Sequence, residues 1–262
     1  MRVTAANPGI MTGPGTNTYL VGTTELVVVD PGPLDEDHAI AVAAAGGGRI
    51  GRIVVTHTHR DHAPGSARLA QLTGAEVIGF GPAEGFRPDR SVRDGVAVEV
   101  RGVTLRAVHT PGHASDHLCW LLEQEATLFS GDHVMEGSTV VIAPPDGDMT
   151  AYLESLRRLR GLDPPVSAIA PGHGRMIGDP AGVIDAVVAH RRRREEAVAA
   201  ALGAAGTTTV DELLPVVYAE VATELVPVAR FSLWAHLRKL RAEGRAETDN
   251  AEDFWAPWRA VG

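Results

Sequence analysis

Residues 53–62 read Ile-Val-Val-Thr-His-Thr-His-Arg-Asp-His, an apolar run followed at once by a polar turn. The β-branched run predicts a buried strand. Because alternate residues of an extended chain point to one side, His57, His59 and Asp61 share a direction, while His62 lies where the chain turns toward the next predicted helix. Imidazole and carboxylate groups together suit zinc or a similar divalent ion. The stretch therefore predicts one part of a metal site.

Three further loops carry the same kinds of side chain at the ends of apolar runs. They contain Gly112-His113, Gly131-Asp132-His133 and Gly172-His173. A glycine in such a loop lets the backbone and a ligand approach each other closely. Four strand-end loops with this chemistry in one domain indicate a shared metal centre.

The composition restricts how such a metal could be held. The chain has 262 residues, of which 44% are hydrophobic, and its 24 basic and 33 acidic side chains give a net charge of −9. This apolar content excludes a disordered chain. A single cysteine excludes an intramolecular disulfide and a cysteine-based zinc ribbon, so the 11 histidines and the carboxylates must supply the ligands.

No stretch of the sequence suggests export or a membrane anchor. The apolar runs are strand-sized, far below the roughly 18–20 residues of a membrane-spanning helix. The first residues lack the apolar segment of a secretory signal. We therefore expect a cytoplasmic protein with no membrane association.

Strands and helices are mixed along residues 17–178. The pattern predicts strands at 18–21, 26–29, 53–56, 76–79, 96–100, 103–107, 117–122, 127–130 and 166–170, and helices at 35–45, 66–73 and 150–159. Several neighbouring strands form hairpins, which favours a layered α/β (α+β) fold over a doubly wound parallel sheet. A long helix at 179–205 follows, and we interpret its arginine run at 191–194 as a solvated face.

The composition becomes helical near residue 204, so we divide the chain into a catalytic domain, residues 1–204, and a C-terminal domain, residues 205–262. Thr209 and Glu212 have the spacing of a capping box that opens a helix to about residue 218. Two more helices are predicted at 220–225 and 232–242, and a wing follows. Three short helices and a wing are typical of a small winged-helix module.

Together these motifs resemble the metallo-β-lactamase superfamily. The matching residues are the H-x-H-x-D-H motif at 57–62, Gly-His at 112–113, Gly-Asp at 131–132 and Gly-His at 172–173. The resemblance implies an αββα sandwich with a two-metal site at one edge. It places the first metal on His57, His59 and His113 and the second on Asp61, His62 and His173, with Asp132 bridging the two.

Other stretches are similar to the β-lactamase-like protein 2 (endoribonuclease-type) subgroup. They are Asn-Thr-Tyr-Leu-Val-Gly at 17–22, the segments 110–117 and 129–133, and the winged-helix-like tail. This subgroup contains single-strand-directed endoribonucleases and other hydrolases. Glyoxalase II and related thioesterases share the metal motifs but usually have a different C-terminal region.

The expected cofactor is two zinc ions per chain, with manganese and iron as alternatives. A water between two such ions should ionise near neutral pH and act as the nucleophile, with the catalytic Asp61 orienting it. The same site suits an acyl carbon or a phosphodiester, so a small-molecule acyl substrate and single-stranded RNA both remain open. We expect ester or thioester hydrolysis, because residues 181–262 carry ten basic against 12 acidic side chains.

The remaining histidines receive simpler interpretations. His117 and His133 lie beside the ligand loops and are candidates for substrate binding. We place His38, His190 and His236 on the solvent faces of helices. For the tail three roles stay open: guiding a nucleic acid, lining the substrate cleft, or forming the surface of a homo-oligomer.

Overall fold

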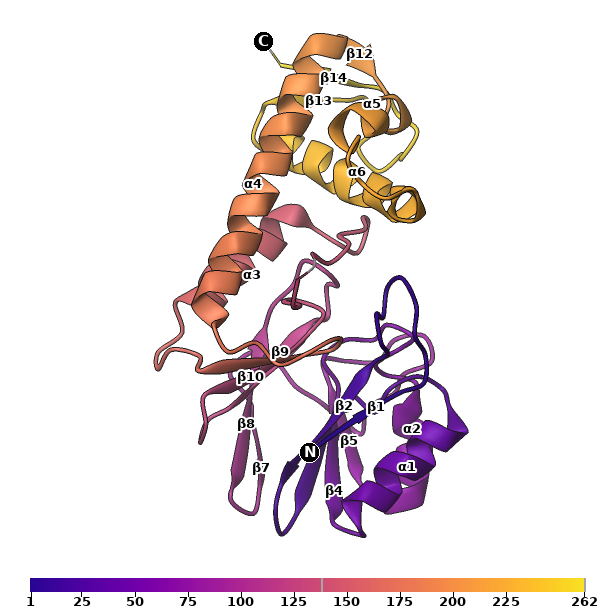
Figure 1. Cartoon of the computed structure of the whole chain (residues 1–262), viewed down its shortest axis with the longest axis vertical. Helices are drawn as coiled ribbons and strands as arrows, with labels where there is room; N and C mark the ends of the chain where they lie inside the picture. The colour runs from indigo at the N-terminus through magenta and orange to yellow at the C-terminus, as the bar shows by residue number, and fades with distance from the viewer. Residues whose placement is uncertain (138, 262) are drawn as a thin grey trace.

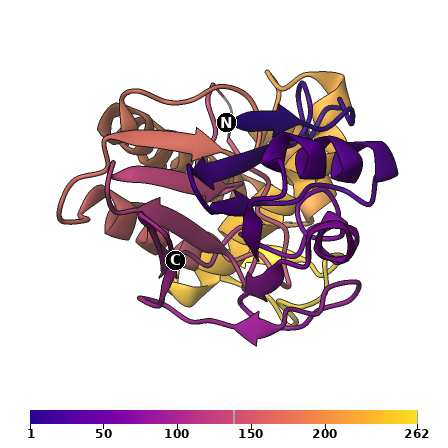
Figure 2. The ribbon, with the colours of Figure 1, turned by 90° about the horizontal axis from the view of Figure 1, so that it is seen from below.

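Two β-sheets face each other in the computed structural model, which describes residues 1–137 and 139–261. Helices lie along the outer side of the N-terminal sheet, others lie over the upper end of the second sheet, and a C-terminal unit lies beyond them (Figure 1). In the view from below, the N-terminal sheet in indigo and purple lies against the second sheet in magenta and salmon (Figure 2). The predicted αββα sandwich is therefore confirmed.

The first sheet is mixed and has the order β1-β2-β3-β4-β5-β6. Its strands are β1 (Arg2–Thr4), β2 (Asn17–Gly22), β3 (Leu26–Val29), β4 (Ile50–Val54), β5 (Glu76–Gly79) and β6 (Arg90–Ser91). Strands β1 to β3 are antiparallel, and β3 to β6 are parallel. Helices α1 (Glu36–Gly46) and α2 (Gly65–Thr73) supply the crossover connections that parallel strands require.

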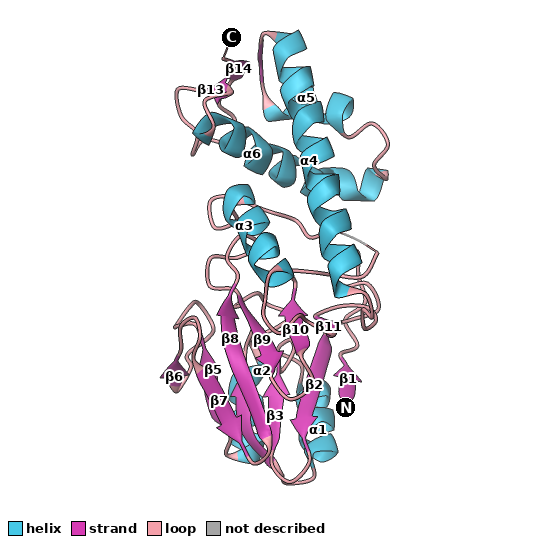
Figure 3. Ribbon diagram, turned by 90° about the vertical axis from the view of Figure 1, so that its left-hand side faces the viewer, coloured by secondary structure: helices cyan, strands magenta, loops and turns pink. Residues whose placement is uncertain are grey.

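The second sheet has the order β11-β10-β9-β8-β7. Its strands are β7 (Ala97–Val100), β8 (Val103–His109), β9 (Leu118–Leu122), β10 (Thr127–Gly131) and β11 (Ala168–Pro171). Only β10 and β11 pair in parallel, and α3 (Met149–Arg160) connects them. Helices α3 and α4 (Pro180–Ala205) lie near this sheet in Figure 3.

Alternation along the strands explains the layers. In β3, Val27 and Val29 join the core between the two sheets, while Leu26 and Val28 pack toward α1 and α2. Both faces of a covered strand must be apolar, which is why this strand reads as a continuous hydrophobic run. The strands and helices predicted for residues 17–178 are all present, with ends shifted by a few residues.

The C-terminal unit contains α5 (Val210–Val217), the short 3₁₀ helix η1 (Thr223–Leu225), α6 (Val226–Ala242) and a small sheet of β12 (Thr207–Thr208), β14 (Trp258–Ala260) and β13 (Ala246–Glu247). The predicted helix over 220–225 is wrong, because only the 3₁₀ turn forms there. The last helix begins at Val226 rather than at 232, since Pro227 occupies its first turn, where a proline is well tolerated.

Helix α4 belongs to both parts of the chain. Its first half places Ile184 and Val187 in the core beneath the second sheet, and its second half places Val198 and Leu202 in the core of the C-terminal unit. Helix α4 ends at Ala205, and the division of the chain between residues 204 and 205 stays a prediction. Within the described ranges, no helix has the combination of length and apolar character that crossing a bilayer would need.

The capping box at the start of α5 offers a test of the tail. The Glu212 amide donates to Thr209 Oγ1 at 3.4 Å, and the Thr209 amide donates to Glu212 Oε2 at 2.8 Å. Thr209→Ala should lower the free energy of unfolding by about 1 kcal/mol, because the Glu212 amide loses its acceptor. Thr209→Ser keeps the hydroxyl and should stay within about 0.5 kcal/mol of the parent. Urea denaturation compares the three proteins, and equal losses in both variants would contradict this role.

Candidate metal centre

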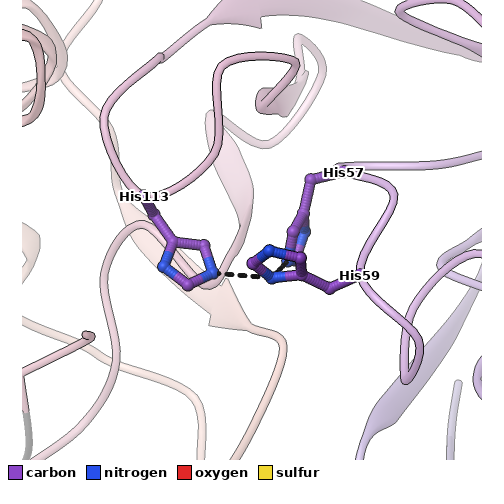
Figure 4. A group of neighbouring side chains, drawn as sticks. All are labelled: His57, His59 and His113. Atoms are coloured by element: carbon purple, nitrogen blue, oxygen red, sulfur yellow. Dashed lines mark hydrogen bonds between the residues drawn. The ribbon is translucent and has the colours of Figure 1, made fainter. Parts of the chain in front are cut away.

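The predicted ligands come from four loops, which follow β4, β8, β10 and β11. The first group is His57, His59 and His113, whose rings converge in Figure 4. His59 Nδ1 lies 3.0 Å from both His57 Nε2 and His113 Nε2. His57 and His113 are buried, whereas His59 is exposed, so this group is open to solvent on one side.

The second group is Asp61, His62 and His173, joined by Asp132. The Nε2 atoms of the two histidines lie 3.2 to 3.4 Å from Asp61 Oδ2 and Asp132 Oδ1. Neither His62 Nε2 nor Asp132 Oδ1 has a hydrogen-bond partner, although both atoms are buried. Four ligand atoms arranged tetrahedrally at about 2.0 Å from an ion are about 3.3 Å apart. The spacing therefore fits a common cation better than hydrogen bonding among the four side chains.

Asp132 lies between the two groups. Its Oδ1 faces His62 and His173, while its Oδ2 is 3.7 Å from His113 Nε2 in the first group. One carboxylate thus directs an oxygen to each group, which is the arrangement that a bridging ligand needs.

The other ring nitrogen of each buried ligand is fixed by an acceptor. His62 Nδ1 donates to Asp30 Oδ2 at 2.8 Å, His113 Nδ1 to the Val141 carbonyl at 2.8 Å, and His173 Nδ1 to the Gly15 carbonyl at 3.2 Å. Carbonyl and carboxylate oxygens accept only, so each Nδ1 carries the proton. In the neutral ring, Nε2 then presents a lone pair to the centre, as a metal ligand must.

The sequence of the chain matches known proteins over the same residues. The Metallo-beta-lactamase superfamily matches residues 11–173, and the Beta-lactamase associated winged helix domain matches residues 209–255. The chain belongs to the metallo-beta-lactamase superfamily. It is accordingly a hydrolase, and the predicted winged-helix tail is confirmed.

Two curated relatives show the range of the superfamily near this chain. The Beta-lactamase-like protein 2 homolog of Drosophila melanogaster is 31% identical over 97% of this chain and 91% of its own length. The Atrochrysone carboxyl ACP thioesterase of Aspergillus fumigatus is 36% identical over 68% of this chain, which spans only 56% of that protein.

Solved structures agree with the fold. The metallo-beta-lactamase family protein TTHA1429 from Thermus thermophilus has a TM-score of 0.82 and 23% identity, over 100% of this chain and 98% of its own. TTHA1623, solved in a di-iron-bound form, is 27% identical with a TM-score of 0.54, over 69% of this chain and 96% of its own.

The histidines of the candidate metal centre fall into two sets by the direction in which their pKa values are shifted. Burial, followed by the charge of His62, holds the pKa of His57 well below its usual value, and burial lowers that of His113 to about 4. Burial also lowers the pKa values of His62 and His173, but the neighbouring carboxylates raise them by more. Asp132 and Asp30 raise the pKa of His62 well above its usual value, and the carboxylates of Asp132 and Asp61, 3.3 and 3.2 Å from His173 Nε2, raise the pKa of His173 to about 9.

The two carboxylates stay ionised. Burial would raise the pKa of Asp132, but the charges of His62 and His173 hold it well below its usual value. For Asp61 as well, the neighbouring imidazoles of His173 and His62, 3.2 and 3.3 Å from its Oδ2, outweigh burial and lower the pKa. Protons on these two histidines thus balance the carboxylates, and a bound cation would replace those protons.

The predicted ligand set has a neighbour that the sequence motifs do not include, Asp30, which directly follows β3. Its carboxylate accepts hydrogen bonds from the Thr56 amide at 2.7 Å and the Thr56 hydroxyl at 2.8 Å, in addition to His62. The Thr56 hydroxyl in turn accepts from His57 Nδ1 at 3.0 Å. Asp30 therefore orients His62 directly and His57 through the Thr56 hydroxyl. The feature of the sequence that could have indicated this role is the position of Asp30 directly after an apolar run.

Glycine allows the loops to come this close. A Cβ atom on Gly172 would lie 2.6 Å from His62 Cε1 and 2.8 Å from Asp132 Oδ1. Gly131 has a φ of +48°, and its Cβ would lie 2.6 Å from Thr56 Oγ1. The close approach expected from these glycines is confirmed.

His117 and His133 lie behind the ligands. The His117 ring stacks on His57 with centroids 4.9 Å apart, and the His133 ring lies 5.6 Å from His117 and 4.7 Å from Tyr152. Both side chains are fully buried. Their positions favour support of His57 over the predicted contact with a substrate.

The surface positions predicted for two other histidines are wrong. His38 is buried because α1 turns it toward β2, where its Nε2 lies 2.8 Å from Thr18 Oγ1. His236 is fully buried because α6 packs this face against α4, with Nδ1 3.6 Å from Glu195. His190 is half-buried and faces a cavity.

A cleft of about 710 Å³ opens onto Asp132 and His113. Its walls come from the N-terminal loop, the segment after β10, α4 and the tail. The lining is Ile10, Met11, His113, Asp132, Met135, Gly137, Thr139, Val140, Val141, Val183, Ala186, Val187, His190, Leu225 and Val228. Apart from the two metal-site residues, His190 is the only titratable side chain among these residues. The tail thus lines the cleft, one of the three roles left open by the sequence.

The hydrogen bond between Asp30 and His62 generates a prediction for metal affinity. Asp30→Asn removes the charge that orients and polarises His62, so zinc should bind about 10–100-fold more weakly. Competition between the protein and a chromophoric chelator measures this affinity. Asp37→Asn, on the exposed side of α1, is the matched control and should bind zinc as the parent does. An unchanged affinity in folded Asp30→Asn would refute the orienting role.

Proposed function

We propose that the chain is a binuclear, zinc-dependent hydrolase that cleaves a carboxylic ester or thioester. The observation that carries this proposal is the apolar cleft that opens directly onto Asp132 and His113. Ligand clefts for small molecules combine such apolar walls with a few polar groups at the reacting end.

The residues present fit two ions. His57, His59 and His113 would hold the first, Asp61, His62 and His173 the second, and Asp132 both. The di-iron-bound relative TTHA1623 supports a binuclear site and keeps iron, like manganese, as an alternative to zinc. When bound, the two ions would supply Lewis acidity and a water that ionises near neutral pH.

Asp61 is the proposed catalytic carboxylate. Its side chain is 26% exposed, against 13% for Asp132, so it is the carboxylate of the set that solvent reaches more easily. Thr16 Oγ1 donates to Asp61 Oδ2 at 3.3 Å and helps to fix its direction. From this position Asp61 can accept a hydrogen bond from an attacking water and orient it.

The charges of the tail argue for an acyl substrate. Three basic side chains of the tail are paired with carboxylates: Arg230 with Asp211 at 2.6 Å, Arg238 with Glu252 at 2.8 Å and Lys239 with Glu195 at 2.9 Å. Binding of nucleic acid depends on cations that are free to replace counterions along the phosphates. The similarity to a protein named as a thioesterase points the same way.

The second candidate is a single-strand-directed endoribonuclease or phosphodiesterase with the same metal site. The winged-helix match and the similarity to the Beta-lactamase-like protein 2 homolog over nearly the whole chain favour it. The cytoplasmic location and a homo-oligomer remain predictions from the sequence.

A parallel assay distinguishes the two functions. The zinc-loaded protein should hydrolyse an acyl thioester and an aryl ester but not single-stranded RNA. Asp132→Ala should reduce the rate at least about a hundredfold, because the Lewis-acid contribution amounts to several kcal/mol. Asp185→Ala, an exposed carboxylate on α4, is the control and should retain full activity. RNA cleavage that Asp132→Ala abolishes, without thioester turnover, would establish the second candidate.

Removal of the metal should also destabilise the protein. An ion that binds the folded protein alone, present at about 1,000 times its Kd, adds about 4 kcal/mol of stability. A chelator should therefore lower the Tm by roughly 10 °C in a chain of this size. Asp132→Ala should show a much smaller shift. Equal shifts in both proteins would mean that the ion lies elsewhere.

A further inference from the structure

The arginine run in α4 is divided between two environments. Arg191 is 3% exposed and Arg194 is half-buried, whereas Arg192 and Arg193 are exposed. Residues three apart on a helix share a face, so Arg191 and Arg194 point the same way, toward the C-terminal unit. The interpretation of the run as a solvated face is therefore correct for the two middle arginines and wrong for the outer two.

Arg191 and Arg194 line a recess of about 150 Å³ between α4, the segment after β10 and the tail. His190, Tyr218 and Ser232 are its other main polar side chains. None of the residues that line it, all within the described ranges, is acidic. The recess therefore combines two guanidinium groups with neutral donors.

Several donors in this recess lack partners. Arg191 Nε, His190 Nδ1 and the Tyr218 hydroxyl are buried without a hydrogen bond. Arg191 donates from another nitrogen to the Val140 carbonyl, and Arg194 donates to the Val217 carbonyl and lies 4.3 Å above the Tyr218 ring. A buried cation without a counter-ion is unfavourable, so these groups point to a ligand that brings negative charge.

Nearby carboxylates do not supply that charge. Glu195, one helical turn beyond Arg191, is occupied by other cations, since Lys239 Nζ lies 2.9 Å and Arg245 Nη1 3.6 Å from its Oε1. Among the described residues, no ion pair joins Arg191 or Arg194 to an acid. The positive field of these arginines also acts on His190, whose pKa is lowered by burial first and then by Arg191 and Arg194.

The recess adjoins the cleft of the metal centre. The two share lining residues, including Val140, His190 and Leu225. A ligand that occupies both would have one end at Asp132 and His113 and the other at the two arginines, with apolar walls between.

We propose that this recess is an anion subsite that binds a single carboxylate or phosphate of the substrate, remote from the bond that is cleaved. The inference rests on the proposed function and narrows its substrate class to amphiphilic acyl compounds: apolar in the middle, reactive at one end, anionic at the other. A small recess behind apolar walls suits one such group, whereas a strand of RNA would place successive phosphates against the apolar part of the cleft.

The test compares charged and neutral substrates. Octanoyl N-acetylcysteamine is the neutral thioester, 7-carboxyheptanoyl N-acetylcysteamine carries a carboxylate on the acyl part, and octanoyl phosphopantetheine carries a phosphate on the leaving group. The parent should prefer one of the two charged thioesters over the neutral one, and the preferred compound shows which part of the substrate carries the anion.

Arg194→Gln should reduce kcat/KM for the preferred charged thioester about tenfold, mainly through KM, as expected for one lost charge-assisted contact. Its kcat/KM for the neutral thioester should stay unchanged. Arg191→Lys keeps the charge but not the planar donor group, and should show an intermediate loss for the charged substrate alone. Arg192→Gln and Arg193→Gln are the matched controls from the same helix and should leave every substrate unaffected.

A binding measurement separates this inference from the proposed function. In isothermal titration calorimetry, octanedioate and inorganic phosphate are titrated into each protein, and Arg194→Gln should raise the Kd of at least one about tenfold. If no thioester is cleaved, the proposed function fails, while calorimetry still decides the subsite. The proposal is overturned if Arg194→Gln reduces kcat/KM equally for the charged and the neutral thioesters. It is also overturned if the parent shows no preference between these thioesters and Arg194→Gln changes neither Kd. An effect of Arg194→Gln on RNA cleavage alone would overturn it as well.

Discussion

The structure depends on the carboxylate of Asp132, which lies 3.3 to 3.7 Å from the Nε2 atoms of His62, His173 and His113. Asp132 Oδ1 and His62 Nε2 are buried without hydrogen-bond partners, although potential partners are only 3.3 to 3.4 Å away. Such an arrangement is unfavourable unless a cation, or protons in its place, balances the charge. Each loop around the site is shaped to hold these groups together, and Asp30 fixes two of them through His62 and Thr56.

The sandwich provides the rigid support for this convergence. Ligands follow β4 in one sheet and β8, β10 and β11 in the other, so the centre lies where both sheets end. Close packing of Val27, Val29 and Trp120 between the sheets fixes the distance between those loops. Beyond the centre, α4 carries the chain into the C-terminal unit, and that unit returns Leu225 and Val228 to the wall of the cleft.

Residues that lie close together in the sequence, or in similar loops after strands, could be assigned to the candidate site from the sequence. The H-x-H-x-D-H motif and the three Gly-containing loops contain the residues that the structure brings into three overlapping groups. Prediction from the sequence failed where a side chain's surroundings come from distant segments. The contact between Asp30 and His62 could not be predicted from spacing, because the two residues are 32 positions apart in the sequence. His38 and His236 looked like ordinary helix-surface histidines, since the segments that cover them are remote in the sequence.

By itself, the sequence determined the superfamily, the layered fold, the ligand chemistry and the presence of a winged-helix tail. These properties follow from the periodicity of apolar residues and from the chemistry and spacing of nearby side chains. Both are local and do not depend on which distant segments pack together. Only the tertiary structure decided what surrounds the centre: the apolar walls of the cleft, the partners of the tail's cations, and the burial of Arg191 beside the exposed Arg192. Burial and pairing depend on which distant surfaces meet, and that depends on the packing of α4 against both cores.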